Sequence, residues 1–273
     1  MNFKAMLIGL MLQLVAVKSG ATAGDFHHGL GSIRLGNYKD AVAILAPLAE
    51  QGHAKAQFEL GVLYLMGKGV TKDLVRAASL HMQSAEQGNV KAQAHLGHML
   101  DNGEGVLVDH KSSLKWYLLA AEGGHINAQY ELANKYARGA DGYAVRKDVR
   151  KAAKWYTLAA EQGDMDAQYE LGVMYSKGVG VMEDDNIAVK WFTLSAKQGD
   201  VYAQVALADM YITGDGVLVD YLRAYMWRNI AAYNGDESSH AAKVSLANEM
   251  TNRQIVEAQD LASRCLGSGY TDC

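Results

Sequence analysis

Apolar and small residues recur along the chain with the spacing of one face of a helix. In one segment they are Ala167, Leu171, Gly172 and Tyr175, at offsets of 4, 5 and 8 residues from the first. These offsets place the four side chains on one side of an α-helix. Because the residue beside each leucine is small, a neighbouring helix can approach closely. The pattern also occurs at Ala56/Leu60/Gly61/Tyr64, Ala92/Leu96/Gly97/Leu100, Ala128/Leu132/Ala133/Tyr136 and Ala203/Leu207/Ala208/Tyr211.

A second helical pattern follows each of these segments after a turn. The turns have the form Gly-x-Gly-Val, as at residues 178–181, where glycine accepts the positive φ that a helix end requires. An aspartate follows the turn in every unit. We interpret it as the N-cap of the second helix rather than as one of a row of metal ligands, because a cap needs only the local amides. These aspartates are Asp73, Asp109, Asp148, Asp184 and Asp220.

The second helices share a bulky residue and, four positions later, a small one. The bulky residues are Leu80, Trp116, Trp155, Trp191 and Trp227, and the small ones are Ser84, Ala120, Ala159, Ser195 and Ala231. All four tryptophans therefore occupy equivalent positions. We expect them to lie between stacked helices rather than against a cofactor.

The two patterns together form a repeat of about 36 residues. Its marker is AEQG at Ala49, Ala85 and Ala160, with variants at Ala121, Ala196 and Ala232, so that the spacings are 36, 36, 39, 36 and 36. A fixed period of this size predicts a stack of helix pairs. The predicted repeats are 49–84, 85–120, 121–159, 160–195 and 196–231. A helical hairpin at 24–48 and helices within 232–273, the last opened by a capping box at Thr251, would cap the two ends.

The run LGVMYSKGVGVMEDDNIAVKWFTLSAKQGD resembles the Sel-1-like repeat, a relative of the tetratricopeptide repeat. The leucine-glycine-tyrosine helix, the Gly-x-Gly-Val turn, the aspartate cap, the Trp-Tyr/Phe pair and the Ala-x-x-Gly end all occur in order. The chain departs from the pattern at Leu80-His81, in the insertion of the third repeat and at Ala144. The resemblance implies an all-α fold, a right-handed α-solenoid of antiparallel helix pairs whose concave wall binds other proteins.

Composition narrows the function further. The chain has 273 residues, of which 49% are hydrophobic, and a formal net charge of -4. There is no basic surplus to attract a phosphate backbone or an anionic membrane, so neither nucleic acid nor lipid headgroups are expected partners. A composition this apolar also excludes a disordered chain.

The first 23 residues read as a secretory signal peptide. Lys4 precedes an apolar run from residue 5 to 17, and small residues end the segment at Ala23. The run is too short to span a bilayer as a helix, so we expect a chain that is not transmembrane after cleavage, and a periplasmic or secreted location. A buried N-terminal helix is the alternative interpretation. Cleavage after Ala23 would remove Lys4 and Lys18 and change the formal charge from -4 to -6.

Cys265 and Cys273 are the only cysteines. In an oxidising compartment they would most simply bond to each other, and closing so short a loop contributes about 2.5 kcal/mol of stability. Two free thiols are the alternative. No Cys-x-x-Cys pair is available for zinc or redox chemistry.

The resemblance also indicates which residues face a partner, because tetratricopeptide relatives present one face of the first helix to the groove. On that face, exposed aromatic and polar residues suit an extended polypeptide. The predicted anchors are Phe58, Tyr130, Tyr169 and Tyr202, and the predicted polar contacts are His98, Asn134 and Asp209. The alternative is that the aromatics only fill seams between helices. A glutamine that follows each core alanine repeats too faithfully to select a ligand, so we predict a structural bridge for Gln57, Gln93, Gln129, Gln168 and Gln204.

Signals for catalysis or metal binding are weak. Ser112 and Lys115 form an S-x-x-K motif of penicillin-recognising enzymes, but no SDN or KTG motif accompanies it. His95 and His98 could share a metal with His81, yet no HExxH motif supports such a site. No catalytic residue, metal or cofactor is therefore predicted.

The sequence predicts an exported, monomeric scaffold or adaptor that binds a protein or peptide. One alternative is a penicillin-binding or β-lactamase-like hydrolase of the cell envelope. Another is a structural subunit of an envelope or exopolysaccharide export complex, which would bind through its convex face or its caps.

Overall fold

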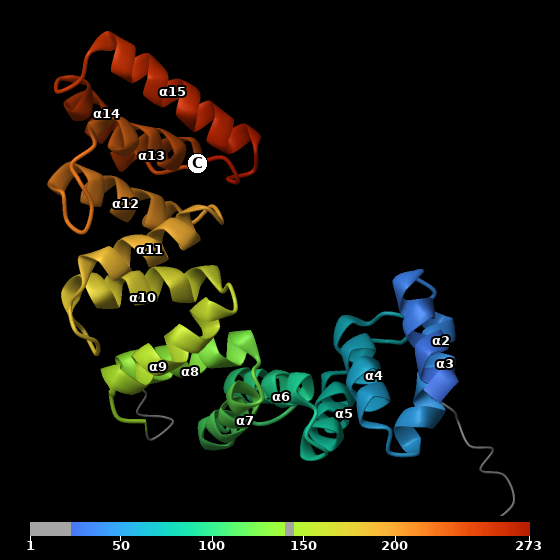
Figure 1. Ribbon diagram of the computed structural model, residues 1–273. Helices are drawn as coiled ribbons and strands as arrows, with labels where there is room; N and C mark the ends of the chain where they lie inside the picture. Colours follow the sequence, from blue (N-terminus) through green and yellow to red (C-terminus); the bar gives the residue numbers. More distant parts are fainter. Residues whose placement is uncertain (1–22, 140–144) are drawn as a thin grey trace, which may run out of the picture. The chain divides into compact units, whose positions relative to one another are not determined.

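The computed structural model describes residues 23–139 and 145–273, and every regular element of these ranges is a helix (Figure 1). The predicted signal peptide and Ala144 lie outside the described residues, apart from Ala23. Fourteen helices follow one another in the described ranges: α2 (Ala23–Arg34), α3 (Tyr38–Glu50), α4 (Ala54–Met66), α5 (Leu74–Glu86), α6 (Val90–Asn102), α7 (His110–Glu122), α8 (Ile126–Arg138), α9 (Val149–Glu161), α10 (Met165–Lys177), α11 (Asp185–Ala196), α12 (Val201–Thr213), α13 (Tyr221–Tyr233), α14 (Ser238–Ala247) and α15 (Asn252–Gly267).

The chain divides into two compact units. Unit 1 is Met1–Trp116 and unit 2 is Tyr117–Cys273, so the boundary falls inside α7. Within unit 1, each helix from α2 to α6 packs against the next. Within unit 2 the same holds from α8 to α14, and α15 returns to pack on α13. Within residues 23–139 and 145–273, none of the helices combines the length and the hydrophobicity that a membrane span requires.

Small residues on the first helices make room for side chains of the second helices. A Cβ added at Gly172 would lie 2.7 Å from the ring of Phe192, and one added at Gly61 would lie 2.9 Å from the ring of His81. The leucines beside these positions are fully buried, as Leu171 is in unit 2. The close approach of paired helices predicted from the sequence is therefore confirmed.

The predicted aspartate caps are also confirmed. Asp184 Oδ1, for example, accepts a hydrogen bond of 3.1 Å from the backbone N–H of Ile187. The same contact is made by Asp73, Asp109, Asp148 and Asp220. The first helices have caps that the sequence analysis missed, and two of them are histidines that it left without a role. His53 Nδ1 and His125 Nδ1 accept from the amides of Ala56 and Ala128.

The second glycine of each described turn touches the preceding helix pair. Gly180 has a φ of +78°, and an added Cβ would overlap the carbonyl oxygen of Val149 at the start of α9. Gly105 makes the equivalent approach to Leu74 in unit 1. No side chain can be placed there without moving the two pairs apart.

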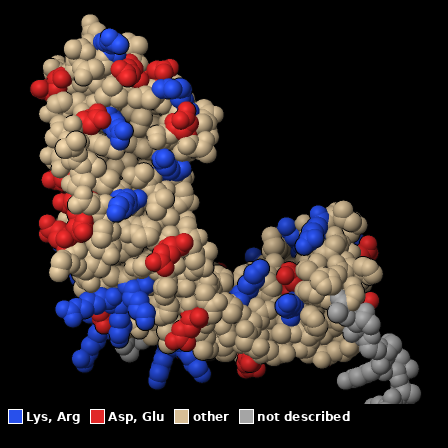
Figure 2. Space-filling model, viewed as in Figure 1, with Lys and Arg blue, Asp and Glu red and all other residues tan. Residues whose placement is uncertain are grey.

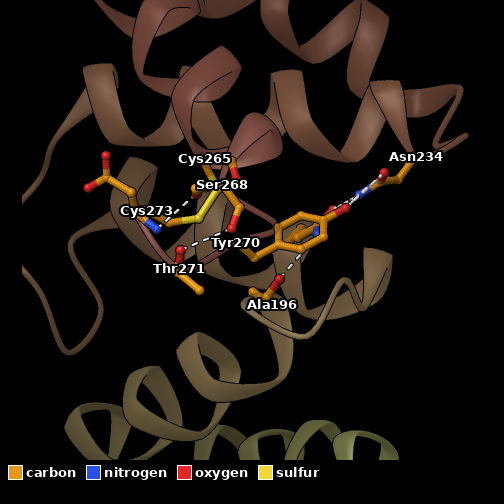
Figure 3. Close-up of a disulfide and its surroundings, with 9 residues drawn as sticks. Ala196, Asn234, Cys265, Ser268, Tyr270, Thr271 and Cys273 are labelled. Atoms are coloured by element: carbon orange, nitrogen blue, oxygen red, sulfur yellow. Dashed lines mark hydrogen bonds between the residues drawn. A yellow bond between two sulfur atoms is a disulfide. The ribbon is translucent and has the colours of Figure 1, made fainter.

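The C-terminal end is closed by a cap and a disulfide (Figure 3). Thr251 and Gln254 form the predicted capping box at the start of α15. Cys265, fully buried in α15, is bonded to Cys273, and their Cα atoms lie 4.7 Å apart. The loop between them brings Tyr270 next to Asn234, which follows α13.

The four tryptophans share a repeat position but differ in exposure. Trp155 and Trp191 are half-buried against the core around Leu171, and Trp116 is half-buried against a core of unit 1. Trp227 is buried because α14 and α15 both pack on α13. The repeat therefore sets where each tryptophan lies on its helix, whereas the packing of the C-terminal cap decides how exposed Trp227 is.

Replacing Gly180 by alanine tests the contact between helix pairs. We expect Gly180→Ala to lower the free energy of unfolding by more than about 2 kcal/mol, because it adds a steric overlap to an unfavourable φ. The matched control is Gly163→Ala, at a φ of +93° with no atom near the added Cβ. It should cost only about 1 kcal/mol. Urea unfolding followed by circular dichroism measures both, and equal losses would contradict the contact.

Candidate partner-binding site

The repeated glutamines hold successive helices together. Gln168, on α10, donates through Nε2 to the carbonyl of Ala160, at the end of α9, over 3.1 Å. Its Oε1 accepts from Gln198 Nε2, which follows α11, at 2.8 Å. The bond to the carbonyl eight residues back recurs at Gln57, Gln93, Gln129 and Gln204. The structural role predicted for these glutamines is confirmed.

The series ends on the disulfide-closed tail. Asn234 takes the place of the donating glutamine and gives its Nδ2 to Gln204 Oε1 at 3.1 Å. The Tyr270 hydroxyl lies 2.9 Å from the same Nδ2 and 3.1 Å from Asn234 Oδ1 (Figure 3). The last buried amide, Gln204, is thus satisfied by Asn234, which the disulfide-closed tail holds in turn through Tyr270.

The second helices α5, α9, α11 and α13 each place one bulky or polar side chain against the first helix of their own pair, directly after the tryptophan position. The residues are His81, Tyr156, Phe192 and Arg228, and all are buried. We call this position the inner seat. This position borders the predicted partner-binding face. The side chain that occupies it therefore decides which residues of that face make contacts within the fold.

Two of the residues predicted as polar contacts instead bind side chains of the inner seat. Asn134 Oδ1 accepts a hydrogen bond of 2.7 Å from the Tyr156 hydroxyl. Asp209 is ion-paired with the buried Arg228, whose Nη1 also reaches Asp236 at 3.9 Å. Asn134 and Asp209 therefore have structural partners, which the sequence analysis did not anticipate because it treated the seat only as part of the aromatic pair.

The predicted contacts of unit 1 differ from each other. Phe58 is only 8% exposed and packs against the rings of His81 and His95 at centroid distances of 5.4 and 5.2 Å. It fills a seam between helices, which was the alternative considered for the aromatics. His98 is exposed on α6 and lies 3.7 Å from Glu104. Phe58 and His98 belong to unit 1, whereas the other five predicted contact residues belong to unit 2.

Three predicted anchors form a set on the first helices of unit 2. Tyr130 on α8 and Tyr169 on α10 are half-buried, and each has one side against the inner seat of its own pair, Tyr156 or Phe192. Tyr202 on α12 is 73% exposed, and its ring centroid lies 5.9 Å from that of Tyr169. We call Tyr130, Tyr169 and Tyr202 the tyrosine strip.

Carboxylates surround the strip. Burial raises the pKa of Asp166, and the charges of Asp164 and Asp200 raise it further. Burial raises the pKa of Glu170, although Arg138 acts in the opposite direction. Burial and the charges of Glu170 and Asp200 also raise the pKa of Tyr169. The strip therefore lies in a negative potential that the nearby cation offsets only in part.

His81 is an unusual occupant of the inner seat. It is fully buried, and neither ring nitrogen has a hydrogen-bond partner among the residues that the structure describes. Burial lowers its pKa to about 3, and the neighbouring His95 contributes to the shift. A buried imidazole without partners destabilises the fold relative to a hydrocarbon ring of similar size.

The motif considered for catalysis serves a helix cap. The Ser112 hydroxyl donates to Asp109 Oδ2 at 2.6 Å, and these bonds lower the pKa of Asp109. The Lys115 ammonium lies over the Trp116 ring, 5.9 Å from its centroid. Among the described residues, no group of three or more His, Cys, Asp or Glu side chains could hold a metal ion.

Five Sel1 repeats match the chain, at residues 54–89, 90–125, 126–164, 166–200 and 201–236. They cover more than half of its length. The chain belongs to the Sel1 repeat family. Each matched range starts a few residues after the corresponding repeat of the sequence analysis. No curated protein shows significant similarity to the chain.

Two solved structures resemble this Sel1 repeat protein over most of its length. One is a protective antigen present in uropathogenic Escherichia coli strains that displays an SLR fold, with 32% identity and a TM-score of 0.79. The match covers 96% of this chain and 56% of that chain, so this protein spans little more than half of the antigen's length. The other is a Sel1 repeat protein from Oxalobacter formigenes, with 30% identity, a TM-score of 0.74 and coverage of 88% and 99%.

Membership of the family confirms the all-α solenoid of helix pairs expected from the sequence. Sel1 repeats generally mediate protein–protein interactions, and proteins built from them are typically scaffolds without enzymatic activity. A function of this kind depends on the residues that a partner can reach.

A test of the inner seat is His81→Phe. Between about pH 6.5 and pH 3, His81 binds a proton in the unfolded chain but not in the folded one. The stability of the wild type should therefore fall on acidification through this range, by up to about 1.4 kcal/mol per pH unit from this residue. His81→Phe should remove this part of the slope and stabilise the fold by about 1–3 kcal/mol at neutral pH, because no polar atom stays unpaired.

Urea unfolding of both proteins at neutral and acidic pH measures the effect of His81→Phe. The control is His240→Phe, at an exposed histidine of α14. An acid slope that stays the same in His81→Phe would contradict the buried, uncharged imidazole.

Proposed function

We propose that this Sel1 repeat protein is an exported scaffold that binds an extended segment of a partner polypeptide along the tyrosine strip of unit 2. The observation that carries the proposal is the strip itself, because three tyrosines with accessible ring surface stand on successive first helices. Rings that are already held on one side lose little conformational freedom when a partner covers the other.

Charge favours a partner segment that contains lysine or arginine. Asp166 and Glu170 border the strip with raised pKa values, so a cation placed nearby would relieve their repulsion. The engaged side chains of Asn134 and Asp209 support the inner-seat residues, and we assign them a structural role beside the strip rather than direct contact.

Export is supported by the N-terminal residues and by the tail. Residues 1–23 have the charge, apolar run and small-residue end of a signal peptide. Cys265 and Cys273 are positioned to form a disulfide, which persists in an oxidising compartment. The resemblance to a protective antigen is consistent with a location outside the cytoplasm.

Site-specific crosslinking tests the strip. A photo-crosslinking amino acid placed at Tyr169 or Tyr202 should capture the partner, and an excess of a basic peptide should reduce the yield. The matched controls are Val244 on α14 and Val256 on α15, which are 69% and 64% exposed. Capture through these controls alone would instead support binding through the C-terminal cap.

Fractionation of cells that express the full chain tests export. We expect a mature protein outside the cytoplasm whose N-terminal residue is Gly24 and whose two cysteines are oxidised. A chain without residues 2–23 is the control and should stay in the cytoplasm. A full-length cytoplasmic product that retains Met1 would contradict the proposal.

A further inference from the structure

The tyrosine strip is a row of ring faces rather than an apolar groove. Tyr202 is 73% exposed, and Tyr130 and Tyr169 are half-buried. On α8, α10 and α12, which the structure describes in full, Tyr202 is the one exposed side chain among the large hydrophobic residues. An amphipathic helix instead docks through several anchors, one turn apart, that enter an apolar groove. The strip therefore suits a partner that packs against rings better than one that inserts a helix.

The backbone around the strip offers no edge for β pairing. Every regular element in the described part of unit 2 is a helix, so the N–H and C=O groups of α8, α10 and α12 are bonded along their own helices. A bound β strand needs a row of free backbone groups, because its own N–H groups lose water when it binds. A proline-rich segment avoids this cost, since proline has no N–H and a polyproline II helix has no internal hydrogen bonds.

Two rings of the strip have a spacing that fits such a segment. The ring centroids of Tyr169 and Tyr202 lie 5.9 Å apart, with 40° between the ring planes. Two residues of a polyproline II helix advance about 6.2 Å, so two prolines of one segment can each cover a ring. The Tyr169 ring also packs on Phe192, with 5.9 Å between the centroids. A partner would therefore cover a ring whose position is already fixed.

The charge beside these rings is negative. Asp166 lies close enough to Asp164 and Asp200 for their charges to oppose its ionisation, and Glu170 acts in the same way on Tyr169. Figure 2 shows lysines and arginines gathered over the α8–α9 end of unit 2, with aspartates and glutamates at the level of α10 and α11. A cation of the partner is therefore attracted to α10, beside the rings.

We propose that the tyrosine strip binds a proline-rich segment in the polyproline II conformation, with a lysine or arginine next to the prolines. The inference rests on the function proposed above and names the chemistry of the partner. The prolines pack on the rings of Tyr169 and Tyr202, and the basic side chain lies beside Asp166 and Glu170. Because a polyproline II segment is ordered before it binds, it loses little conformational freedom on the strip.

Fluorescence anisotropy with synthetic peptides and the purified protein tests the inference. The probe is a labelled proline peptide with arginines at both ends. It should bind about tenfold or more tightly than a peptide with the same arginines around a glycine–serine core, because only the proline core is ordered in advance. A proline core between glutamates should bind about tenfold or more weakly than the probe.

Variants locate the binding. Tyr202→Ala should weaken binding of the probe about tenfold or more, because it removes an exposed ring that anchors the prolines. The matched control is Tyr233→Ala, at a tyrosine of α13 that is 76% exposed and lies outside the strip, and it should bind as the wild type does. Asp166→Asn/Glu170→Gln should lower the affinity and reduce its salt dependence. Circular dichroism confirms that each variant is folded.

The outcomes distinguish this inference from the proposed function. Equal affinity for the two arginine peptides would overturn the inference while the proposed binding of a basic segment stands. Tighter binding of a basic peptide that forms an amphipathic helix would also overturn it, as would an equal effect of Tyr202→Ala and Tyr233→Ala. If neither arginine peptide bound and no partner were captured at Tyr169 or Tyr202, the proposed function itself would be contradicted.

Discussion

The fold depends on a buried amide that joins successive helices. In each repeat a glutamine of the first helix donates to a carbonyl at the end of the preceding second helix, as Gln168 does to Ala160. Its oxygen accepts from a side chain that follows the second helix of its own pair, so one glutamine joins three successive helices. An unpaired amide at such depth would cost stability, and the arrangement therefore tolerates no shift of the helices along one another. The exception is Gly123, which holds the repeat position of Gln198 and has no side chain that could donate to a glutamine.

The inner seat then decides what the first helices can offer to a partner. With Tyr156 in the seat, Asn134 becomes its hydrogen-bond acceptor, and with Arg228 there, Asp209 becomes its counter-ion. With Phe192 in the seat, no polar partner is needed and Tyr169 keeps an accessible edge. The side chain in the inner seat thus decides whether a residue of the first helix has a structural contact, as Asn134 and Asp209 do, or keeps surface for a partner, as Tyr169 does.

Charge is separated within unit 2 although the chain is nearly balanced. Carboxylates of α10 and of the N-cap of α12 surround the tyrosine strip, whereas five exposed lysines and arginines lie within residues 146–154, around the start of α9. A partner segment that contains lysine or arginine is therefore attracted to the strip rather than to the start of α9.

Local patterns determined much of this molecule. Helix periods, glycine turns and aspartate caps depend on neighbours in the chain, and each was predicted correctly, as was the role of the glutamines. Whether a side chain is buried depends instead on which residues of other helices pack against it. Phe58 and Tyr130 hold the same repeat position, yet His81 and His95 cover one while the other keeps accessible surface. Only the tertiary structure could decide that, because the deciding neighbours are distant in sequence.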